Sequence, residues 1–189
     1  MALTLADHAV RPLTADEVER MVQEGIIGED EPVELLQGAL VEMSPKGEQH
    51  ATVMARLVGW LAPLAVAGTH ELRTEHPLAV PDPTSLPEPD IAVIEARADP
   101  TRRPTSALLV VEVSVSSRAI DTTIKPRLYA SAGVPDYWVV DVAARRIEIR
   151  RDPAGSEYRT LDTGEGDQTV EALCLDLRPL NAAALLSGI

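Results

Sequence analysis

The chain is poor in cysteine and has no long apolar run. Its one cysteine, Cys174, leaves no partner for an intramolecular disulfide, which suits a reducing compartment. We therefore expect Cys174 to be a small buried residue. No stretch is long and apolar enough for a transmembrane helix, and the first residues lack the charged leader and apolar core of a signal peptide. These absences favour a cytoplasmic protein that does not act in a membrane.

Basic side chains are also scarce, and lysine is much rarer than arginine. The chain has 30 acidic and 17 basic side chains and a formal net charge of −13. Proteins that coat nucleic acid by charge alone are basic, so this composition disfavours that class. All the basic residues are arginines except Lys46 and Lys125. A lysine kept against such a bias suits a role that needs a compact point charge or a removable proton.

The apolar pattern predicts one α/β domain over residues 1–189, a length that can bury a real core. Helices are expected from the capping box Thr14–Glu17, and at Glu48–Ala67, Asp121–Ala132 and Asn181–Leu186. Because Pro126 fits the third helix only in its first turn, we place the start of that helix near Thr123.

Strands are predicted where apolar and β-branched residues gather between turn signals. They are Val33–Leu36 and Ala39–Met43 (a hairpin), Thr69–Thr74, Leu78–Val80, Ile91–Ile94, Leu108–Val115, Asp136–Val142, Arg146–Arg151, Glu157–Leu161 and Gln168–Leu173. The expected fold is a mixed β-sheet core flanked by helices, with an N-terminal helix and a β-hairpin.

One charge interrupts the strand that we expect at the centre of the sheet, Leu108–Val115. The strand is nearly continuous in apolar residues and rich in valine, which favours burial on both faces. A carboxylate inside a protein needs a cation, a metal or a proton. Either Glu112 lies at the strand end in solvent, or it is a ligand near the carboxyl end of a central strand, where α/β sheets place their chemistry.

Asp90 is expected to meet Glu112. It ends a proline-rich loop, residues 81–90, and directly precedes the strand Ile91–Ile94. If the two strands are antiparallel neighbours, the start of one lies beside the end of the other. Two carboxylates there suit Mg²⁺, and Lys125 on the next helix could reach the same spot. An acid pair with a lysine is a recurrent arrangement for phosphodiester hydrolysis.

Simpler interpretations stay open for several polar residues. Lys125 could pair only with Asp121, one helical turn before it. His50, near the start of its helix, could be a hydrogen-bonded or surface residue. Glu34 and Glu42 suit the solvent face of a hairpin. Three aromatic residues and one acid suit core packing and turn capping: Tyr129, Tyr137, Trp138 and Asp141.

A string of residues through the middle of the chain carries a family resemblance. It consists of Pro89-Asp90, Glu112-Val113-Ser114, Asp121, Lys125, Tyr129, Gly133-Val134, Asp136-Tyr137-Trp138 and Asp141, preceded by Glu34, Gly38, Met43-Ser44-Pro45 and His50. This order resembles the Uma-two family of restriction-endonuclease-like proteins, within the PD-(D/E)XK nuclease superfamily. The resemblance covers roughly Pro32 to Arg151.

The resemblance implies a restriction-endonuclease-like fold and a metal site. It implies that Asp90 and Glu112 bind Mg²⁺ or Mn²⁺, with the backbone carbonyl of Val113 as a further ligand. Glu34 matches an N-terminal acid that would complete the site.

The chain departs from the superfamily in the place of the lysine. The usual position is two residues after the glutamate, where this chain has Ser114. In the Uma-two pattern the following helix supplies the lysine, and Lys125 matches it. The resemblance then implies that the geometry is kept.

The leading functional expectation is metal-dependent hydrolysis of phosphodiester bonds, with DNA as the partner. One alternative is a non-catalytic module that binds nucleic acid or protein and keeps the nuclease fold. Another is hydrolysis of a small phosphorylated molecule. The charge of −13 favours the alternatives, and the presence of Asp90, Glu112 and Lys125 favours the enzyme. The sequence leaves the oligomeric state open, with a homodimer considered.

Overall fold

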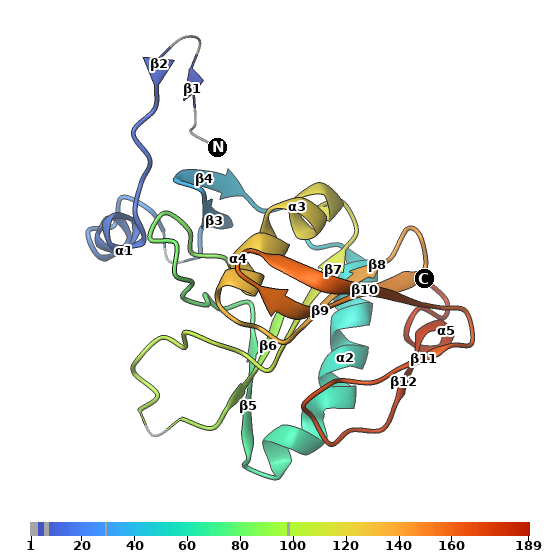
Figure 1. The fold of residues 1–189 in the computed structure, drawn as a ribbon. Helices are drawn as coiled ribbons and strands as arrows, with labels where there is room; N and C mark the ends of the chain where they lie inside the picture. The colour runs from blue at the N-terminus through green and yellow to red at the C-terminus, as the bar shows by residue number, and fades with distance from the viewer. Residues whose placement is uncertain (1–3, 6–7, 29, 98) are drawn as a thin grey trace.

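A six-stranded mixed sheet lies at the centre of the computed structural model, which describes residues 4–5, 8–28, 30–97 and 99–189 (Figure 1). In spatial order its strands are β10 (Glu157–Glu165), β9 (Arg146–Ala154), β8 (Asp136–Asp141), β7 (Leu109–Ser114), β6 (Ile91–Glu95) and β5 (His70–Thr74). All neighbours are antiparallel except β7 and β8. Those two are parallel because the chain between them crosses over through helices. The sheet confirms the α/β prediction.

Helices cover both faces of the sheet. On one face lies α2 (Glu48–Val66), and on the other lie α3 (Arg118–Thr123) and α4 (Lys125–Ser131) (Figure 1). No helix in the described part of the chain is long and apolar enough to cross a bilayer.

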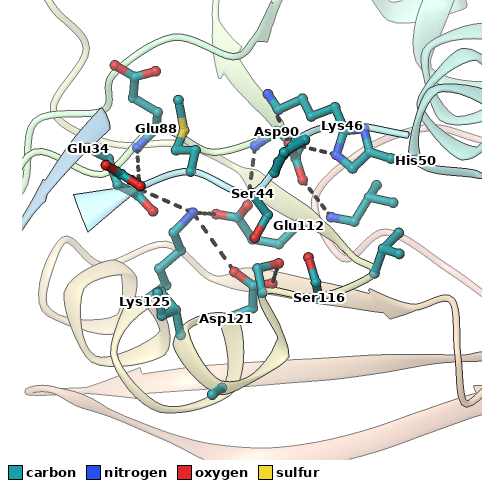
Figure 2. A pocket seen from close by; sticks show the side chains of 18 residues that line it. Glu34, Ser44, Lys46, His50, Glu88, Asp90, Glu112, Ser116, Asp121 and Lys125 are labelled. Atoms are coloured by element: carbon teal, nitrogen blue, oxygen red, sulfur yellow. Dashed lines mark hydrogen bonds and ion pairs between the residues drawn. The ribbon is translucent and has the colours of Figure 1, made fainter. Parts of the chain in front are cut away.

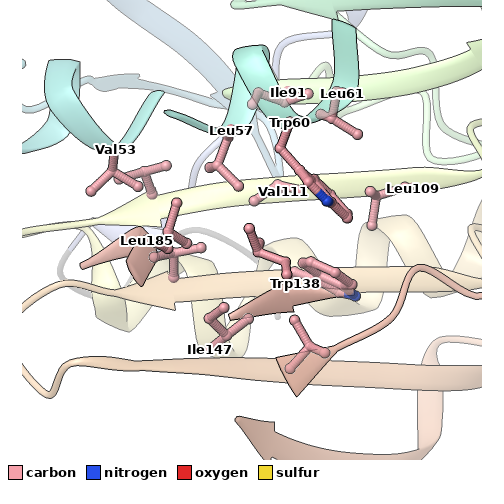
Figure 3. Close-up of a cluster of buried hydrophobic side chains, with 14 of the residues drawn as sticks. Val53, Leu57, Trp60, Leu61, Ile91, Leu109, Val111, Trp138, Ile147 and Leu185 are labelled. Atoms are coloured by element: carbon pink, nitrogen blue, oxygen red, sulfur yellow. The ribbon is translucent and has the colours of Figure 1, made fainter. Parts of the chain in front are cut away.

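The alternation of side chains along β7 decides which residues reach each face. Leu109, Val111 and Val113 pack with α2 in the larger apolar cluster, which also holds the stacked rings of Trp60 and Trp138 (Figure 3). Val110 packs on the opposite face, in the cluster that includes Tyr129 of α4 and Tyr137. Glu112 is in register with Val110 and therefore faces α3 and α4. The predicted core role of the aromatic residues is confirmed.

The N-terminal part forms a smaller unit beside the sheet. It contains β1 (Thr4–Leu5), β2 (His8–Ala9), α1 (Ala15–Gln23), β3 (Val33–Leu36) and β4 (Ala39–Glu42). The predicted capping box is present, since Thr14 and Glu17 each accept a backbone N–H of the other.

The β3–β4 hairpin turns at two left-handed residues and docks on the loop that leads to β6. Gln37 has φ 51° and Gly38 has φ 83°, as a tight hairpin turn requires. The backbone N–H of Leu86 donates to the carbonyl of Leu35 at 2.7 Å. This contact holds the hairpin against the segment that ends at Asp90.

The C-terminal segment returns to the α2 side of the sheet. It contains β11 (Thr169–Val170), β12 (Leu180–Asn181) and α5 (Ala182–Leu185). The strand predicted at Gln168–Leu173 is therefore much shorter. The strand predicted at Leu78–Val80 is wrong, because its backbone bonds to loop residues: the N–H of Leu78 donates to Pro87 and that of Ala79 to Pro104.

Two further predictions need correction. The helix expected at Asp121–Ala132 is two helices, α3 and α4, which meet at Ile124. Pro126 lies in the first turn of α4, as expected, because its ring and missing N–H would break a continuous helix there. Cys174 is exposed, since it follows the short β11 outside the core.

Candidate active site

A pocket of about 210 Å³ opens where the hairpin, the sheet and both helical layers meet (Figure 2). Its wall is formed by the β3–β4 hairpin, the loop into α2, the adjoining ends of β6 and β7, and the helices α3 and α4. Six of its lining residues carry carboxylates: Glu34, Glu42, Glu88, Asp90, Glu112 and Asp121.

Strand register brings Asp90 beside Glu112. Strands β6 and β7 are antiparallel with Ile91 opposite Val111, so the preceding Asp90 lies opposite Glu112. The backbone N–H of Asp90 points to Oε2 of Glu112 at 3.4 Å. The backbone N–H of Val113 donates to Oδ2 of Asp90 at 2.7 Å. Antiparallel pairing therefore places both acids at one point of the sheet.

Glu112 is enclosed and charge-paired rather than solvated, being 2 % exposed. Its Oε1 accepts a hydrogen bond from the Tyr129 hydroxyl at 2.9 Å and lies 3.1 Å from Nζ of Lys125. Burial raises the pKa of Glu112 well above its usual range; the ammonium of Lys125 opposes the rise, and Asp90 among other acids adds to it.

Asp90 has the opposite electrostatic situation. Its Oδ1 lies 3.1 Å from Nε2 of His50 and 3.7 Å from Nζ of Lys46. Burial alone would raise the pKa of Asp90, but the hydrogen bond and charge of His50 and the N–H of Val113 outweigh it and hold this pKa below the usual range. The two neighbouring acids therefore differ in their tendency to hold a proton.

Lys125 links three carboxylates from three elements. Its Nζ lies 3.1 Å from Glu112, 3.3 Å from Glu34 and 3.9 Å from Asp121. Burial would lower the pKa of Lys125, but these carboxylates raise it above the usual value, so the side chain is an ammonium ion. The pair with Asp121 is the longest of the three, so the simple helix-pair interpretation accounts for only part of its contacts.

Glu34 and Asp121 are buried members of the same cluster. Glu34 is 6 % exposed, and its Oε2 accepts the backbone N–H of Glu88 at 3.2 Å. The solvent-face interpretation therefore fails for Glu34 and holds for Glu42, which is exposed. Burial also raises the pKa of Asp121, and Lys125 opposes this rise.

The structure also locates three other residues that the sequence singled out. Ser114 is buried near the end of β7, on the same face as Glu112. Asp141 caps a turn, as one interpretation expects, because its Oδ1 accepts the N–H of Ala144 at 2.9 Å. His50 is buried and hydrogen-bonded to Asp90, which makes it part of the pocket.

Sequence reasoning missed two contributors. The hydroxyl of Tyr129 is a direct partner of Glu112, and the sequence offered only its one-turn spacing from Lys125 as a signal. Glu88 also lines the pocket, where burial and the nearby charge of Glu34 raise its pKa. Its place two residues before Asp90 was the available signal, since alternate residues of an extended segment share a face.

The donor chemistry of the pocket fits a hard divalent cation, because Asp90 and Glu112 offer carboxylate oxygens from adjacent strands. Within the described residues, no group of three or more histidine, cysteine, aspartate or glutamate side chains is arranged to hold a metal ion. In the same structure Lys125 is the cation in contact with Glu112.

Comparison with known proteins identifies a family and a similar fold. Residues 15–183 match the model of the Uma2 family, whose description is "Putative restriction endonuclease". A crystal structure of a putative nuclease belonging to DUF820, from Anabaena variabilis, has a similar fold, with a TM-score of 0.72 and 15% sequence identity. The similarity covers 93% of this chain and 98% of that chain. No curated protein matches.

Proposed function

The chain belongs to the Uma2 family, and from this premise we propose that it is a divalent-metal-dependent nuclease that hydrolyses phosphodiester bonds in DNA. The observation that carries the proposal is the convergence of Asp90, Glu112 and Lys125 in one pocket, with Lys125 Nζ 3.1 Å from Glu112. An acid pair and a lysine at one point of a mixed sheet are the groups that this reaction needs.

The proposed ligand set consists of Asp90, Glu112 and the carbonyl of Val113, with Glu34 as an additional acid. Bound Mg²⁺ or Mn²⁺ would supply Lewis acidity toward a phosphoryl oxygen and make a bound water more acidic. The lowered pKa of Asp90 keeps it ionised and ready to bind a cation. Glu34 enters from the hairpin and reaches the same cluster through Lys125.

Lys125 is proposed to stabilise the charge that develops on the phosphate. Its ammonium is fixed by three carboxylates before substrate arrives, so little reorganisation is needed during the reaction. One preorganised donor of this kind is typically worth about 10²–10³ in rate. Arginine would keep the charge but spread it over a planar fork, which cannot place a compact charge at the same point.

The test is a cleavage assay with plasmid and single-stranded DNA in Mn²⁺ or Mg²⁺. Wild type should cleave, and Asp90→Asn should be inactive. Lys125→Arg should stay folded and cleave about 10²–10³-fold more slowly than wild type. Glu157→Gln on the exposed end of β10 is the control for loss of an acid and should keep wild-type activity.

Three outcomes would change the proposal. Equal cleavage by wild type and Asp90→Asn would identify a contaminating nuclease. If wild type and all variants bind DNA but do not cleave it, the non-catalytic module would be favoured. Turnover of a small phosphorylated compound but not of DNA would favour the other alternative.

A further inference from the structure

The two lysines of the chain both line this pocket (Figure 2). The side chain of Lys125 is 6 % exposed, whereas that of Lys46 is 34 % exposed. Lys46 lies in the loop between β4 and α2, at the rim. Among the described residues that line the pocket there is no arginine, so these lysines are its permanent cations.

The charge around the pocket makes the rim lysine important for any anionic ligand. Six carboxylates line the wall and repel a phosphate, and Lys125 is enclosed by three of them. Lys46 has its ammonium at the mouth, beside Asp90 at 3.7 Å. A phosphate approaching Asp90 therefore meets Lys46 first.

The present partner of Lys46 is one that it can exchange. Its Nζ lies 2.9 Å from Oε1 of Glu75, whose side chain is 48 % exposed. Such exposed pairs contribute little to stability, because water and salt screen them. The flexible stem of a lysine also lets its ammonium move between partners.

Glu75 is itself fixed next to the site. Its backbone has φ 55°, and its N–H is shared between the carbonyls of Pro89 at 3.2 Å and Asp90 at 3.1 Å. Glu75 therefore holds Lys46 at the mouth of the pocket while no anion is bound.

We propose that Lys46 is a phosphate-binding residue of this site. Its ammonium would give up the ion pair with Glu75 and bind a backbone phosphate of nucleic acid next to Asp90. The inference rests on the proposed function, because it names the residue by which the same pocket takes its phosphodiester. Lys46 positions the backbone and reads no base, as phosphate contacts generally do.

The test measures the binding of a labelled DNA duplex and of a labelled single strand in EDTA. Fluorescence anisotropy gives the affinity at each of a range of salt concentrations. Affinity falls as salt rises, and loss of one phosphate contact makes this dependence less steep. The magnitude of the slope of log affinity against log salt falls by about 0.9 for duplex and about 0.7 for single strand. For duplex, Lys46→Gln should therefore bind about 15-fold more weakly at about 50 mM salt and about 4-fold more weakly at about 200 mM.

Matched variants separate a phosphate contact from a general change in charge. Lys46→Arg should keep the wild-type slope, and so should Arg159→Gln, which removes a cation from the exposed edge strand β10. Glu75→Gln should tighten binding, but not in a chain that also carries Lys46→Gln. Thermal unfolding should show that Lys46→Gln is as stable as wild type.

The results distinguish this inference from the nuclease proposal. A lower slope for Lys46→Gln without cleavage by wild type would support the phosphate contact and overturn the nuclease. Cleavage by wild type with a wild-type slope for Lys46→Gln would do the reverse. If wild type binds neither DNA probe, or if Arg159→Gln lowers the slope as much as Lys46→Gln, the inference is overturned.

Discussion

Replacing Lys125 with methionine should destabilise the fold strongly near neutral pH. The ammonium lies 3.1, 3.3 and 3.9 Å from Glu112, Glu34 and Asp121. At an effective dielectric constant of about 20, each of these attractions is worth roughly 4–5 kcal/mol before desolvation is subtracted. Removing one partner of a buried ion pair typically costs about 3–5 kcal/mol net, because the other charge is left uncompensated. We expect a loss in that range.

The sign of the pH dependence follows from the pKa shifts. The folded-state pKa of Lys125 is raised, so its contribution is fully present below its unfolded pKa of about 10.4. The folded-state pKa values of Glu112 and Asp121 are also raised, so these acids reduce stability as pH rises above their unfolded values of about 4. Loss of Lys125 raises both further. The destabilisation should therefore be largest at neutral pH and shrink toward about pH 4.

The measurement is urea unfolding in EDTA, with wild type and Lys125→Met compared between about pH 4 and pH 8. Arg127→Met is the matched control, since it removes an exposed cation from the same helix and should change stability by less than about 0.5 kcal/mol. Lys125→Met stability equal to that of wild type near pH 7, or a loss that does not vary with pH, would refute the reasoning.

Two further predictions concern stability in the absence of metal. Burial raises the pKa of Glu112, and Lys125 would still be paired with Glu34 and Asp121 after Glu112→Gln. This variant should therefore melt at a higher temperature than wild type in EDTA at about pH 8, and the difference should vanish near pH 4; a clear loss of stability at pH 8 would contradict this. Gly38→Ala should cost about 1–3 kcal/mol in urea unfolding, because the new Cβ would lie 2.2 Å from Cβ of Pro12 at a φ of 83°. The exposed Gly155→Ala at φ 64°, with nothing within 4 Å of its Cβ, shares the backbone strain and should cost less.

The sequence predicts the sheet and the acid pair because both depend on local patterns. Valine-rich β7 is identified by composition, and antiparallel pairing of β6 with β7 is enough to bring Asp90 to Glu112. Lys125 is found because the helix after β7 must pack back over the sheet. These inferences need only strand period, strand direction and chain connectivity.

The missed features depend on contacts between distant segments. The burial of Glu34 requires the β3–β4 hairpin to dock through Leu35 on Leu86, which no local pattern records. The contact of Lys46 with Glu75 likewise joins two loops. The break at Ile124 has a local cause in Pro126, but the sequence pattern predicted one helix from Asp121 and not a separate helix that begins at Arg118.

The position of Lys125 on a helix has a consequence that a lysine on β7 would not have. A lysine in place of Ser114 would project from β7 on the same face as Glu112, so both groups would come from one strand. Lys125 instead approaches from α4 and contacts both Glu112 on β7 and Glu34 on β3. One ammonium therefore ties the hairpin and the helical layer to the sheet. Because the same charge is proposed to act on the phosphate, docking of the hairpin and assembly of the candidate site are coupled through Lys125.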